Sequence, residues 1–101
     1  MYFRVVRFTG VTPERITRVV TGVKDADGPP EGIPATGVQF LYDESQQTAV
    51  VLQQFDTAQD MDKGDRAFAA MDPSEAPGTR VSVDMCELKL GLAGAGFPAR
   101  D

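Results

Sequence analysis

The sequence predicts a single α+β domain in which two helices cover one face of a four-stranded antiparallel sheet. Three observations predict it. Four short segments are rich in aromatic and β-branched residues, two segments carry apolar residues at helical spacing, and their order is strand, helix, strand, strand, helix, strand. A chain of 101 residues, with 42% hydrophobic and 25% charged residues, has the size and composition of one globular domain.

The first strand and the first helix are expected within the first 24 residues. Residues 2–8, YFRVVRF, have the composition of a strand. Thr12 then supplies an N-cap hydroxyl, Pro13 suits the first helical position, and Glu14 lies near the positive end of the helix dipole. The helix is expected to end near Lys24. Its apolar stripe consists of Ile16, Val19, Val20 and Val23.

A long loop and a hairpin are predicted next. Residues 25–36, DADGPPEGIPAT, contain three prolines and two glycines, which favours a surface loop. Residues 37–42, GVQFLY, and 48–55, TAVVLQQF, are strand patterns on either side of the polar turn 43–47. These two strands are therefore expected to pair as an antiparallel hairpin.

The second helix is expected to begin after Thr57, which forms a capping-box pattern with Asp60. It places Ala58, Met61, Phe68 and Met71 on one apolar face and is expected to end near Met71. Gly64, in its middle, is expected to cost about 1 kcal/mol relative to alanine. Pro73 and the pair Pro77-Gly78 follow as terminators.

The last strand is predicted over residues 80–90, RVSVDMCELKL. Its apolar phase changes between Met85 and Cys86, which predicts a possible bulge there. The domain is expected to span residues 1–90, and the glycine-rich residues 91–101 are expected to form a flexible tail.

This order of elements predicts the ferredoxin-like βαββαβ arrangement. The sheet pattern also predicts a partner, because both of its faces carry apolar side chains: Val50 and Leu52 oppose Ala49, Val51 and Phe55. Leaving several such side chains in water would forgo roughly 1.5–3 kcal/mol each. We therefore expect a second copy to cover the second face, giving a homodimer.

Charge and residue usage exclude several classes of function. A net charge of −5 argues against nucleic acid as a partner, and no apolar run is long enough to cross a membrane. The single cysteine, Cys86, can form neither an internal disulfide nor a zinc site in a chain without histidine. We expect a soluble cytoplasmic protein with no metal and no cofactor.

Two arginines interrupt the first strand from opposite faces. Arg4 and Arg7 are each expected to form an ion pair with Asp84 or Glu87, although an anion clamp in a pocket is the functional alternative. The acidic residues of the second helix, Asp60, Asp62 and Asp65, are interpreted as a solvated face.

A small aromatic or planar polar ligand would bind between sheet and helices in this arrangement. Strand glutamines and Tyr42 offer hydrogen bonds there, and solvent-facing strand positions explain them equally well. The candidate ligand-binding residues are Arg7, Tyr42, Gln53 and Phe68. No catalytic residue is assigned, because Cys86 lacks a base to activate it.

Three segments carry a resemblance to a known superfamily. They are YFRVVRF with the following Thr12-Pro13-Glu14, the glycine-led strand GVQFLYD, and residues 55–61, FDTAQDM, where an aromatic residue ends a strand before a small polar helix cap. Over residues 2–90 the chain resembles the dimeric α/β-barrel superfamily that includes the antibiotic biosynthesis monooxygenase (ABM) domains. The resemblance implies a homodimer whose sheets face each other.

The absence of His, Trp and Asn separates this chain from several active branches of that superfamily. Haem degradation relies on these three residue types and is rejected. The expected function is that of a small dimeric ABM-like module, non-catalytic or binding a small ligand. The alternative is a cofactor-independent monooxygenase or isomerase acting on an aromatic or phenolic substrate, with a buried carboxylate as base. Ligand sensing through backbone contacts, as in the amino-acid-binding ACT domains, also remains open.

Overall fold

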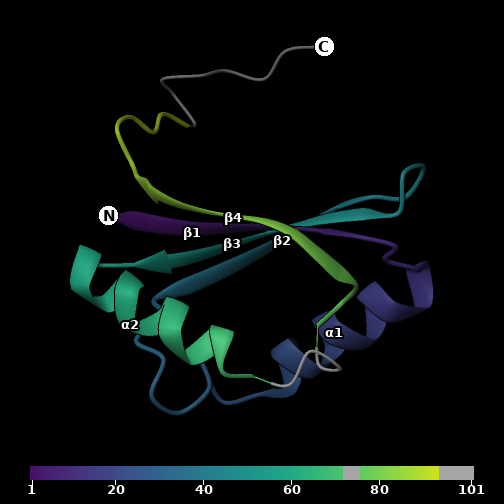
Figure 1. Cartoon of the computed structure of the whole chain (residues 1–101), viewed down its shortest axis with the longest axis horizontal. Coiled ribbons are helices and arrows are strands. Elements are labelled where there is room, and N and C mark those ends of the chain that lie inside the picture. Colours follow the sequence, from purple (N-terminus) through teal and green to yellow (C-terminus); the bar gives the residue numbers. More distant parts are fainter. Residues whose placement is uncertain (72–75, 94–101) are drawn as a thin grey trace.

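Both helices lie against the same face of one four-stranded antiparallel sheet (Figure 1). The computed structural model describes residues 1–71 and 76–93. The strand order β2-β3-β1-β4 places β1 and β3 in the centre, so the predicted ferredoxin-like α+β arrangement is confirmed. The elements are β1 (Tyr2–Thr9), α1 (Pro13–Asp25), β2 (Gly37–Asp43), β3 (Thr48–Phe55), α2 (Ala58–Ala69) and β4 (Thr79–Glu87).

Each helix begins at the cap that the sequence predicts. The Thr12 hydroxyl oxygen accepts a hydrogen bond from the Arg15 backbone N–H at 3.2 Å, and Pro13 follows as the first residue of α1. The Thr57 hydroxyl oxygen accepts one from the Asp60 backbone N–H at 3.0 Å. Each side chain thus satisfies one of the backbone donors that a helix start leaves unpaired.

Alternate residues of the two central strands face the helices. The side chains of β1 and β3 that point toward the helices are buried from Arg4 to Phe8 and from Ala49 to Phe55. Two apolar clusters form there. The first, beside α1, contains Val6, Phe8, Val11, Ile16, Ala49 and Val51, and the second, beside α2, contains Ile33, Phe55 and Met61.

The register of β4 differs from the expected one. Met85 lies opposite Arg4 and Cys86 opposite Phe3, so pairing is continuous where the change of apolar phase placed a bulge. The irregularity lies farther along, between Arg7 and Phe8, and leaves Val81 as the extra residue. The irregularity therefore affects only the start of β4, and Met85 and Cys86 lie on opposite faces of the sheet.

Strand β4 ends at Glu87, three residues before the predicted end. Leu88 still donates its backbone N–H to the Met1 carbonyl at 2.9 Å. Beyond it the exposed residues 88–93 run away from the sheet on the side opposite the helices (Figure 1). Pro73 and most of the predicted tail, residues 94–101, lie outside the described residues. No helix in the described ranges is both long and apolar enough to cross a bilayer.

Candidate functional site

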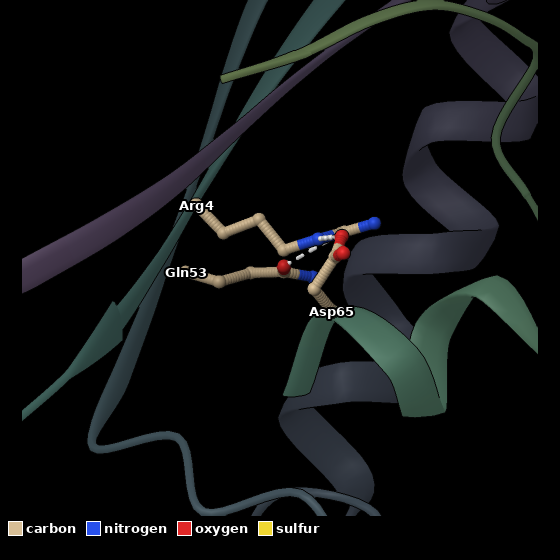
Figure 2. Close-up of polar contacts among 3 residues, drawn as sticks. All are labelled: Arg4, Gln53 and Asp65. Carbon is tan, nitrogen blue, oxygen red and sulfur yellow. Dashed lines mark hydrogen bonds and ion pairs between the residues drawn. The ribbon is translucent and has the colours of Figure 1, made fainter. Parts of the chain in front are cut away.

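The most buried polar group between sheet and helices is the guanidinium of Arg4. Its Nε donates to Oδ1 of Asp65 at 2.8 Å, and its Nη1 donates to Oε1 of Gln53 at 2.9 Å. Figure 2 shows Arg4 and Gln53 extending together from neighbouring strands toward Asp65 on α2. The Arg4 Cζ atom also lies 5.0 Å from the centre of the Phe68 ring, which is a cation–π distance.

The sheet register and helix α2 together bring these four residues close to one another. They are Arg4, Gln53, Asp65 and Phe68, here named the arginine cluster. Arg4 on β1 lies directly opposite Gln53 on β3, and cross-strand partners present their side chains on the same face. Asp65 and Phe68 are three residues apart on α2, so the helix directs both toward the same point. The Arg4 side chain is only 3% exposed, whereas that of Asp65 is 39% exposed.

The partner of Arg4 is therefore neither Asp84 nor Glu87, and that prediction was wrong. Asp84 lies on the opposite face of the sheet, opposite Val5, and Glu87 instead accepts hydrogen bonds from Tyr2 and Lys89. The interpretation of the α2 acids as a solvated face also fails for Asp65. Its place one turn from Phe68, on the inner side of the helix, is the signal that sequence reasoning missed.

The arginine cluster fills the space in which this type of fold would hold a ligand. Along β1 and β3, Arg4 and Gln53 lie between the two apolar clusters. Every buried side-chain nitrogen and oxygen of the described residues has a hydrogen-bond partner. The arrangement is a partly buried ion pair that joins α2 to the sheet, and its buried polar atoms are all hydrogen-bonded.

The predicted ligand-binding residues separate into two places. Gln53 and Phe68 both contact Arg4 and are brought together there. Arg7 lies on the other face of the sheet and Tyr42 on the helix face, but both line a shallow hollow of about 340 Å³ at the end of the β2–β3 hairpin. The structure thus does not unite the four residues in one site.

The Tyr42 hydroxyl already has a structural partner. It donates to the Val11 carbonyl at 2.7 Å, and the Val11 N–H donates to the Gln47 carbonyl at 2.8 Å. The pKa of Tyr42 is raised above its ordinary value, mainly by burial of the phenol and further by the carboxylates of Glu44, Glu14 and Asp43. A raised pKa keeps the phenol protonated and able to donate.

No helix or strand of residues 1–71 and 76–93 covers the face of the sheet away from the helices, here named the open face (Figure 1). Its apolar side chains Phe3, Val5, Val50 and Leu52 are half-buried, and Leu41 is 53% exposed. Strand alternation and cross-strand pairing place further residues on this face: Arg7, Gln39, Asp43, Thr48, Gln54, Ser82, Asp84 and Cys86.

No family model matches this chain, and no curated protein or solved structure does either. Within the described ranges, no group of three or more cysteine, aspartate or glutamate side chains is placed to hold a metal ion.

Proposed function

We propose that this chain is a non-catalytic, ABM-like module that works as a homodimer, with the open face of each subunit packed against that of the other. The observation that supports it most is the composition of the open face. Five aliphatic or aromatic side chains gather there on three adjacent strands, and no helix or strand within residues 1–71 and 76–93 covers them. A monomeric protein rarely leaves so continuous an apolar surface in water.

The filled interior supports the non-catalytic part of the proposal. Catalysis on an aromatic substrate would need a cavity between sheet and helices. That space holds Phe55, Met61 and the arginine cluster instead. The free thiol of Cys86 and the absence of paired cysteines fit a reducing compartment, so the proposed location is the cytoplasm.

The alternative, a cofactor-independent oxygenase for phenolic substrates, draws on the hollow beside Arg7. A guanidinium next to the apolar Leu41 and Val50 has the chemistry to hold a small aromatic anion. The role of Tyr42 there is weaker, because its hydroxyl is engaged by Val11. Oxygen uptake with a panel of hydroquinones and naphthols separates the two functions. A non-catalytic module should leave the rate of oxygen uptake equal to that in buffer alone. Turnover that R7Q abolishes would establish the oxygenase.

The dimer is tested by matched valine substitutions. Val50 lies on the open face, and Val23 is an exposed valine of α1 on the other side of the molecule. We expect V50T to raise the dimer dissociation constant about tenfold or more, because each dimer loses the apolar contact twice. V23T should leave it within about twofold. Sedimentation equilibrium measures both constants.

Two outcomes would contradict the proposed dimer. One is a wild-type protein that stays monomeric up to about 100 µM, well above the usual range for a specific dimer. The other is an equal effect of V50T and V23T, which would show that the interface does not use the open face.

A further inference from the structure

Three charged side chains lie on the open face within the four strands: Arg7, Asp43 and Asp84. Asp43 is satisfied within its own turn, where it accepts hydrogen bonds from Ser45 and Gln46. Arg7 and Asp84 have neither a hydrogen bond nor an ion pair with any residue that the structure describes. The face therefore carries one unpaired cation and one unpaired anion.

These two charges occupy neighbouring strands, Arg7 on the central strand β1 and Asp84 on the edge strand β4. Arg7 lies opposite Ser82 and Asp84 lies opposite Val5, so Arg7 and Asp84 are diagonal neighbours on one face. Half-buried Val5 and Val50 adjoin them. Anything that covers this apolar surface also removes both charges from water, which strongly destabilises a complex unless each charge finds a partner.

A second copy of the chain supplies both partners at once. A two-fold interface is self-complementary, so that a contact from one residue to another is always accompanied by the reverse contact. We propose that Arg7 of each subunit forms an ion pair with Asp84 of the other subunit across the dimer formed by the open faces. This inference rests on the proposed dimer and assigns it a two-fold axis that passes between Arg7 and Asp84.

The net charge of the chain opposes dimerisation, and the crosswise ion pairs offset this repulsion. Each subunit carries −5, so two copies repel one another at long range. Two crosswise ion pairs place opposite charges at the point of closest contact and fix the register of the two sheets. A neutral apolar partner would leave Arg7 and Asp84 buried and unpaired.

Charge reversal with rescue tests the pairing. R7E and D84R each bring like charges together twice per dimer, and we expect each to raise the dimer dissociation constant at least about tenfold. The double variant R7E/D84R restores opposite charges with the order exchanged, and its constant should return to within about threefold of the wild-type value. Sedimentation equilibrium at fixed ionic strength measures all four proteins.

R18E and D62R are the matched controls, because they change the net charge equally at exposed positions of α1 and α2. Both should dimerise like the wild type, and thermal unfolding followed by circular dichroism checks that every variant is folded. The crosswise pairing alone is overturned if R7E and D84R leave the dimer dissociation constant unchanged. It is also overturned if the double variant dissociates as readily as the single variants. A monomeric wild type overturns the proposed function itself.

Discussion

Gly64 lies where α2 packs against the Phe55 ring of β3. A Cβ atom at this position would lie 2.6 Å from two ring carbons of Phe55, which is fully buried. We expect G64A to lower the free energy of unfolding by about 1 kcal/mol, because overpacking of about 1–3 kcal/mol outweighs the gain of about 1 kcal/mol in helix propensity. Urea denaturation followed by circular dichroism measures the difference.

Gly22 provides the control for this prediction. It is exposed in α1, and a Cβ atom there would meet no other atom within 4 Å. G22A should therefore raise the free energy of unfolding by up to about 1 kcal/mol. Equal stabilisation by the two substitutions would contradict the close contact between α2 and Phe55.

The two glycines show what a sequence can say about a single residue. Each of them lies within a helix, and the cost of glycine relative to alanine in a helix is predictable from helix propensity. Which of them is required depends on the residue that packs against it, and Phe55 comes from a strand rather than from α2. That contact is set by tertiary packing and leaves no local signal.

The β2–β3 hairpin is held to the loop before α1 through Tyr42. The phenol donates to the Val11 carbonyl and has a raised pKa, so the folded chain keeps this proton at a pH at which the unfolded chain loses it. The free energy of unfolding should be unaffected by this group below pH 10 and should decrease as the pH rises from there through the folded-state pKa. Chemical denaturation from pH 8 to 11 measures the decrease.

Y42F removes both the hydrogen bond and the titration. We expect it to lower the free energy of unfolding at neutral pH, because the hydrogen bond is lost, and to flatten the alkaline decrease. Y2F is the control, because Tyr2 donates to an exposed carboxylate, that of Glu87, and its loss should leave the decrease in place. An alkaline decrease of the same size in Y42F and in the wild type would assign it to other groups.

At the level of elements, the order, the two N-caps and the hairpin follow from local patterns, and so the sequence predicts them. The loop between α1 and β2 shows where such patterns stop. Ile33 is an isolated apolar residue among prolines and glycines, yet it is only 4% exposed and packs with Phe55 and Met61. Hydrophobic periodicity identifies helices and strands, and a loop has no such periodicity. The burial of Ile33 could therefore not be predicted from the sequence.

The candidate site was predictable only where it depends on local patterns. Strand alternation correctly places Arg4 and Arg7 on opposite faces, because it depends on local parity alone. The partner of Arg4 depends on how α2 lies across the sheet, and parity says nothing about Asp65. The open face is predictable as apolar, but its pair of unpartnered charges appears only once the strand register is known.

For the whole molecule, the single cysteine reports on the proposed dimer. Cys86 lies opposite Phe3 on the open face and is exposed in the isolated chain. Packing of two open faces should shield it, so the rate of its alkylation by iodoacetamide should fall several-fold as the protein concentration rises through the dimer dissociation constant. Quenched samples analysed by mass spectrometry give the rate at each concentration.

A cysteine on the opposite side of the molecule is the matched control. Thr17 is exposed on α1, so T17C in a C86S background should react at a rate independent of protein concentration. If Cys86 also reacts equally fast at all concentrations while sedimentation reports a dimer, the subunits meet through another surface. In that case the apolar side chains of the open face need a different partner, because no helix or strand in the described part of the chain covers them.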